Sequence, residues 1–66
     1  MANEKHSELA AFGVGDRVEL HPATDTWMMG DRYGSVIKIT RSRVHVKMDK
    51  SGRTMRVHPA LITNIS

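Results

Sequence analysis

Residues 43–57 alternate between polar and apolar side chains on both sides of a short loop, and this pattern restricts the fold more than any other. Alternation of this kind is typical of strands that bury one face. Between the two runs, Asp49–Gly52 has the composition of a four-residue hairpin loop ending in glycine. The segment therefore predicts an antiparallel hairpin. The residues expected on its inner face are Val44, Val46, Met48, Met55 and Val57.

The position of the loop predicts which residues face each other across the hairpin. Antiparallel pairing around residues 49–52 puts Val46 opposite Met55 and His45 opposite Arg56. A slip by one residue would bury cations, so this register is well specified. This register gathers several cationic side chains on the outer face. A surface that serves only solubility more often mixes both signs of charge, so the outer face favours an anionic partner. A solvated face with no partner is the alternative. The residues expected to contact an anionic partner are Lys38, Arg43, His45, Lys47, Arg53, Arg56 and His58.

Three more runs have the character of short strands, at residues 17–21, 32–39 and 62–65. Within the second of these, Gly34 is expected to form a bend or a bulge. The loop at 22–31 is expected to contain a single turn over 26–29 closed by Gly30, and residues 59–61 suit a 3₁₀ turn. Five short strands with almost no helix predict a small closed β-barrel, because closure removes exposed edges.

The size of the chain limits its stability. It has 66 residues and no cysteine, so neither disulfides nor a cysteine-ligated zinc ion can reinforce the small core. Small domains of this kind often gain stability by oligomerising or by binding a partner. A homo-oligomer is therefore one expectation. Residues 1–11 are expected to form a flexible N-terminal segment, and residues 12–66 the folded domain.

Charge is distributed unevenly along the chain. Residues 1–31 contain two basic residues against six acidic ones, a net charge of −4, whereas residues 32–66 contain eight against one, a net charge of +7. Such asymmetry suggests an anionic partner for the second half. The alternative is that the two halves neutralise each other in the fold. The sequence has no apolar run long enough to span a bilayer and no signal-peptide pattern, so we expect a cytoplasmic protein with no membrane partner.

Two stretches resemble the KOW motif of SH3-like barrels: Val14–Val18, which reads Val-Gly-Asp-Arg-Val, and Gly34–Ile39. The insert at 22–31 makes the spacing between them longer than is usual for that motif. KOW domains occur in ribosomal proteins and transcription factors, so the resemblance implies contact with RNA or protein.

A second resemblance is to the plasmid-borne type II dihydrofolate reductases, which are also SH3-like barrels. It is carried by Phe12–Val18, Trp27 and Val57–Pro59. The family binds folate and NADPH in the pore of a homotetramer through a Val-Gln-Ile-Tyr segment, where this chain has Met55–His58. Arg56 stands at the glutamine position, His58 at the tyrosine position and Leu20 at that of a family lysine. The resemblance therefore implies the fold class, an all-β, small five-stranded SH3-like barrel, more than the enzymatic activity.

The large apolar residues Trp27, Met28 and Met29 stand in the predicted first loop. They either cap an open end of the barrel or, together with Tyr33, form an oligomer contact or a platform on which bases stack. His45 and His58 are expected to be diagonal neighbours on the hairpin, but a zinc site needs three or four ligands. We therefore expect no metal site, no cofactor and no catalytic residue.

These observations favour a non-catalytic module that binds nucleic acid through phosphates. The first alternative is a module that binds an acidic protein or assembles with itself. The second is an enzyme like the type II reductases, with altered pore residues. The sequence does not distinguish DNA from RNA.

Overall fold

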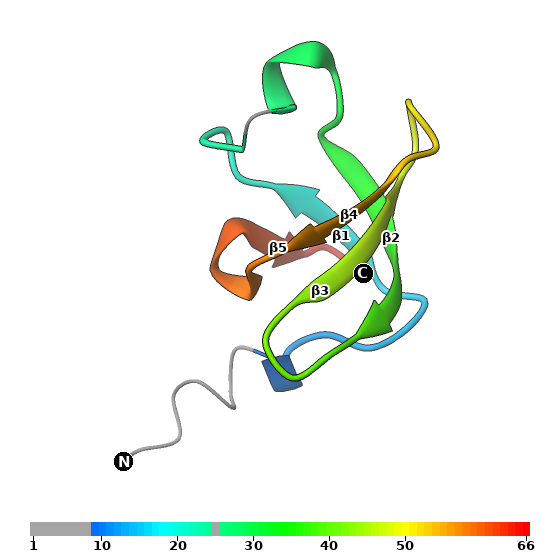
Figure 1. The fold of residues 1–66 in the computed structure, drawn as a ribbon. Coiled ribbons are helices and arrows are strands. Elements are labelled where there is room, and N and C mark those ends of the chain that lie inside the picture. The colour runs from blue at the N-terminus through cyan, green and yellow to red at the C-terminus, as the bar shows by residue number, and fades with distance from the viewer. Residues whose placement is uncertain (1–8, 25) are drawn as a thin grey trace.

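The computed structural model describes residues 9–24 and 26–66, which form an all-β domain of five antiparallel strands in one sheet (Figure 1). In chain order the elements are β1 (Arg17–Leu20), η1 (Trp27–Met29), β2 (Tyr33–Ile39), β3 (Val44–Met48), β4 (Thr54–Val57), η2 (Pro59–Leu61) and β5 (Ile62–Asn64). The two 3₁₀ turns, η1 and η2, lie between strands. Along the sheet the order of the strands is β4-β3-β2-β1-β5.

The expectation of a closed barrel is wrong, because β4 and β5 are the two edges of the sheet and do not pair with each other. Their separation has a local cause. Between them, η2 begins at Pro59, whose nitrogen has no hydrogen to donate, and the Leu61 carbonyl accepts a hydrogen bond from the His21 amide (2.7 Å). Since η2 is tied to the end of β1, the outer edge of β4 stays unpaired.

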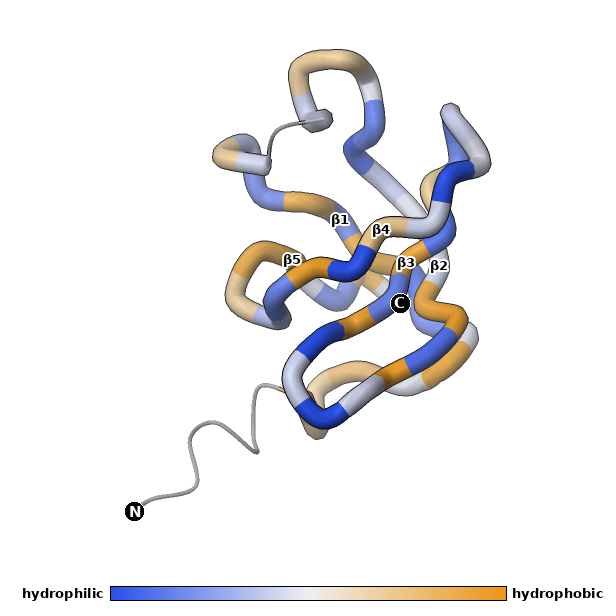
Figure 2. The backbone as a smooth tube through the Cα atoms, viewed as in Figure 1, coloured by the Kyte–Doolittle hydropathy of each residue, from blue (hydrophilic) through white to orange (hydrophobic). Residues whose placement is uncertain are grey.

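The core lies between the two ends of the curled sheet and is made of aliphatic side chains and one methionine. Figure 2 shows hydrophobic and hydrophilic residues alternating along β3 and β4, as the sequence pattern predicts. Five partly buried residues pack against this core: Leu9, Phe12, Trp27, Ile39 and Met55. The buried residues are Val18, Leu20, Val36, Val44, Val46, Met48, Val57 and Ile62.

The predicted hairpin register is confirmed. Val44 pairs with Val57, and Val46 pairs with Met55, while His45 lies opposite Arg56. The ladder ends at the pair of Val44 and Val57, so Arg43 and His58, one step further along the two chains, are not paired in it.

Gly34, where the sequence predicts a bend or a bulge, pairs regularly with Val18 and Met48, and the bulge of β2 lies at Ile37 instead. The register of β2 on β3 shifts between Val36 and Lys38, so that Ile37 is an extra residue. Gly34 has a different structural role, because a Cβ atom there would lie 2.5 Å from Val46 Cγ1 and 2.6 Å from the Lys47 carbonyl oxygen. Glycine lets these two strands approach closely.

Part of the N-terminal segment is attached to the domain. Leu9 packs against the core, and Asn64 Nδ2 donates a hydrogen bond to the Ala11 carbonyl (2.8 Å). Residues 1–8, which make up the rest of the segment expected to be flexible, lie outside the described residues. Across residues 9–24 and 26–66, no helix is long and apolar enough to cross a bilayer.

Candidate anion-binding face

The outer faces of β2, β3 and β4 place three of the expected site residues in one row across the sheet. His45 on β3 pairs with Arg56 of β4 on one side and with Lys38 of β2 on the other. Lys38 and Arg56 are exposed, and the imidazole between them is half-buried. The row combines side chains from three strands, which makes it a preformed feature of the sheet.

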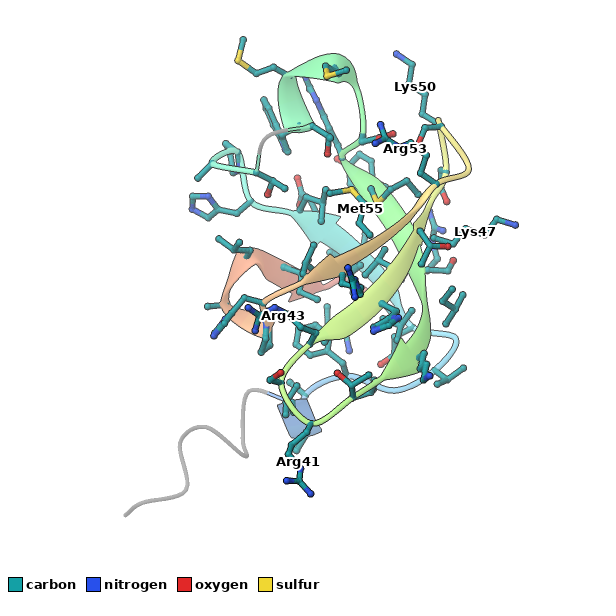
Figure 3. All side chains as sticks on the ribbon, in the orientation of Figure 1. Arg41, Arg43, Lys47, Lys50, Arg53 and Met55 are labelled. Atoms are coloured by element: carbon teal, nitrogen blue, oxygen red, sulfur yellow. The ribbon has the colours of Figure 1, made fainter. Side chains whose placement is uncertain are left out.

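Arg43 and Lys47 extend this row along β3 in opposite directions (Figure 3). Lys47 pairs with Ser35 and Thr54, and its side chain is exposed. Arg43 immediately precedes β3, where its amide donates to Thr40 Oγ1 (3.1 Å). Four residues of extended strand separate their Cα atoms by about 13 Å. We call Lys38, Arg43, His45, Lys47 and Arg56 the basic face.

The two remaining residues expected at this site lie at its margins. Arg53 leaves the hairpin loop and is exposed (Figure 3). His58 follows β4 and caps η2, because its Nδ1 accepts a hydrogen bond from the Ala60 amide (3.0 Å). Only Nε2 of that imidazole is then available to a partner.

Three carboxylates in the described residues, those of Asp16, Asp31 and Asp49, are bonded to groups other than the cations of the basic face. Arg17 on β1 pairs with Asp49 through both guanidinium Nη atoms and also donates to Ser35 Oγ (2.8 Å). The hydrogen bonds from Arg17 hold the pKa of Asp49 below its usual value. Asp31 is buried and accepts a hydrogen bond from Ser51 (3.0 Å). Asp16 accepts from the Gly13 amide and from Asn64 Nδ2.

The Arg17–Asp49 pair is the one salt bridge found within residues 9–24 and 26–66. Its cation comes from the acidic first half and its carboxylate from the basic second half. Within the described residues, therefore, no salt bridge joins a carboxylate of the first half to a cation of the second, and the cations of the basic face remain available to an external anion.

A groove of about 330 Å³ runs beside the unpaired edge of β4. Met55 and Leu61 give it an apolar lining, while Arg43 and Arg56 supply cations. Met55 is held there by a hydrogen bond from Thr26 Oγ1 to its sulfur (3.3 Å). The groove therefore combines apolar surface, positive charge and a strand edge. Ala23 and Thr24 line it from the β1–β2 loop.

Of the four residues expected to form an oligomer contact or a stacking platform, one is partly buried and three are exposed. Trp27 packs against the core, and the Arg32 guanidinium lies 3.8 Å from the centroid of its ring. One face of the indole is therefore covered by a cation. By contrast, Met28 and Met29 are 84% and 69% exposed. Tyr33 on β2 is 45% exposed.

Sequence reasoning missed a repeated tripeptide. His-Pro-Ala occurs at residues 21–23 and again at 58–60. In both copies Nδ1 of the histidine accepts a hydrogen bond from the alanine amide, at 3.0 Å. Both histidines therefore stabilise turns. The identity of the two tripeptides was the signal that could have revealed this.

For the ranges 9–24 and 26–66, no group of three or more histidine, aspartate or glutamate residues is arranged to hold a metal ion. Comparison of the chain with protein-family models, with curated proteins and with solved structures found no match. The fold and the site together define a class: a small all-β domain with a cationic strand face.

Proposed function

We propose that this protein binds nucleic acid through phosphate groups, using the basic face. The observation that carries the proposal is the row of Lys38, His45 and Arg56 across three paired strands. Its cations are exposed, whereas three of the described carboxylates are bonded elsewhere. Phosphate contacts position a protein on nucleic acid without reading its sequence, which suits a site that has several cations and few aromatic groups.

The test is binding of a fluorescein-labelled 20-nucleotide oligomer, single-stranded or duplex, measured by anisotropy between 50 and 300 mM NaCl. Affinity should fall as salt rises, with a log–log slope of about −0.9 for each phosphate neutralised on duplex DNA. The double variant Arg43→Glu with Arg56→Glu should weaken binding at least tenfold at 50 mM NaCl.

A matched control has the same change in charge away from the face. Arg41 lies in the β2–β3 turn and Lys50 in the hairpin loop (Figure 3). The pair Arg41→Glu with Lys50→Glu should reduce affinity less than the pair on the face. Equal losses in both double variants would indicate attraction by net charge alone, and affinity no tighter than millimolar in the unmodified protein would reject the proposal.

A second candidate function is self-assembly or protein binding, which the exposed Met28 and Met29 favour. Exposed apolar side chains next to one another are characteristic of interaction surfaces. Native mass spectrometry of the intact protein in 0.2 and 1 M ammonium acetate tests this function. A salt-resistant oligomer that Met28→Ser with Met29→Ser dissociates would support it.

The resemblance to SH3-like barrels belongs to the same proposal. The order β4-β3-β2-β1-β5, with a 3₁₀ turn between the last two strands, supports it. Type II reductase activity is the remaining alternative, with Arg56 and His58 in the positions of the family's pore residues. Oxidation of NADPH in the presence of dihydrofolate would support it, and no turnover would exclude it.

A further inference from the structure

We infer that the unpaired edge of β4 binds a second kind of partner, an extended peptide in which acidic and apolar residues alternate. The peptide would add to the sheet as a sixth strand. This goes beyond nucleic-acid binding because it uses backbone groups of β4 and the groove beside it, which phosphate contacts do not require.

Alternate backbone groups of β4 point away from β3. The Met48 amide donates to the Arg53 carbonyl (2.8 Å), so these residues form a hydrogen-bonded pair. Bonded and non-bonded pairs alternate along an antiparallel ladder. Thr54 and Arg56 are therefore in non-bonded pairs with β3, and their N–H and C=O groups point to the open edge.

The two faces of an added strand would meet different chemical groups. Successive side chains of a strand point to opposite faces. On the outer face, a residue beside Arg56 would meet that guanidinium and Arg43, which favours aspartate or glutamate. On the inner face, its neighbours would meet Met55 and Leu61 in the groove. Charge complementarity and the apolar lining together select an alternating acidic and apolar sequence.

Strand addition of this kind obtains affinity from main-chain hydrogen bonds and specificity from alternate side chains. The peptide and the nucleic acid would both contact Arg43 and Arg56. Binding of one should therefore weaken binding of the other, whereas the backbone contacts belong to the peptide alone.

The probe is the blocked peptide acetyl-Thr-Glu-Val-Glu-Val-Glu-Thr-amide, carrying a fluorophore and titrated with the full-length protein. Thr54→Pro removes one outward N–H without touching the pairing with β3, and proline is tolerated at such edge positions. We expect this variant to lose at least tenfold in peptide affinity and to bind the 20-nucleotide oligomer as before. Peptide affinity within threefold of the unmodified protein would overturn the inference.

Two modified peptides decide the question with the unmodified protein, should Thr54→Pro fail to fold. One has N-methyl groups on its odd-numbered residues and the other on its even-numbered residues, so each loses the donors of one edge. Strand addition predicts that one of the two binds at least tenfold more weakly than the other. Equal binding by both, or no binding of the parent peptide at millimolar concentration, would overturn the inference and leave the nucleic-acid proposal intact.

Discussion

Lys38 lies directly opposite His45 because Ile37 is an extra residue in β2. Strict alternation from the buried Val36 would have turned Lys38 inward. The bulge gives Ile37 and Lys38 outward positions in succession, and it returns Ile39 to the inner side opposite Val44. One irregular residue thus both protects the core from a cation and adds that cation to the basic face.

This arrangement predicts the effect of removing the lysine. Lys38→Ala should make the slope of log affinity against log salt less negative by about 0.9 on duplex DNA, the value for one phosphate contact. Lys50→Ala, in the hairpin loop, is the matched control and should leave the slope unchanged. Anisotropy titrations at four salt concentrations measure both slopes. Identical slopes for the two variants would remove Lys38 from the site.

The salt bridge between Arg17 and Asp49 predicts how stability depends on pH. The pKa of Asp49 is lowered in the folded state, so the stabilisation is present above the pKa of the unfolded carboxyl, about 3.9. It is lost as the pH falls through the lower folded pKa. Asp49→Asn should therefore be less stable than the unmodified protein at pH 7, with the difference disappearing toward pH 2.

Urea unfolding of both proteins at pH 7, 5, 3 and 2 measures this difference. Since both partners are exposed, 1 M NaCl should reduce it at pH 7. A difference that stays constant down to pH 2 would show that the carboxylate charge is not its source.

The close approach of β2 and β3 at Gly34 predicts a large effect of a single methyl group. Gly34→Ala would force Cβ against Val46 and against the backbone of Lys47, and we expect a loss of about 1–3 kcal/mol in the free energy of unfolding. Gly13→Ala is the control, because its Cβ would lie 3.7 Å from the nearest atom, Asp16 Oδ2. Chemical denaturation should rank the two variants in that order.

The stacking of Arg32 on Trp27 predicts a spectroscopic change, and the chain has one tryptophan to report it. Arg32→Ala would uncover one face of the indole. Acrylamide should then quench its fluorescence more strongly, and stability should fall by about 0.5–1 kcal/mol. Arg41→Ala, an exposed cation in the β2–β3 turn, should change neither quantity. Unchanged quenching in Arg32→Ala would contradict the contact.

The cap on η2 predicts a difference between two replacements of His58. His58→Ala loses the acceptor for the Ala60 amide and should cost about 1 kcal/mol. His58→Asn keeps a side-chain acceptor at that position and should recover part of the loss. Thermal unfolding of the two variants at pH 8 compares them. Equal melting temperatures for both would show that the hydrogen bond contributes nothing.

The sequence by itself determined the hairpin of β3 and β4, its register and the outward direction of its cations. The physical reason is local: residues alternate with a period of two, and any slip exposes Val44 or Val46 and buries a charge. The turn at 59–61 was equally predictable, since proline begins it.

Only the tertiary structure decided the position of the bulge, the open edge of β4 and the partner of Asp49. Each depends on groups far apart in the chain. Arg17 lies 32 residues from Asp49, and the Leu61 carbonyl bonds to His21 instead of to β4. Alternation indicates which side of a strand is apolar. It does not indicate where an extra residue is tolerated or which distant groups form hydrogen bonds and ion pairs with each other. Those choices arise from packing the whole sheet around one small core.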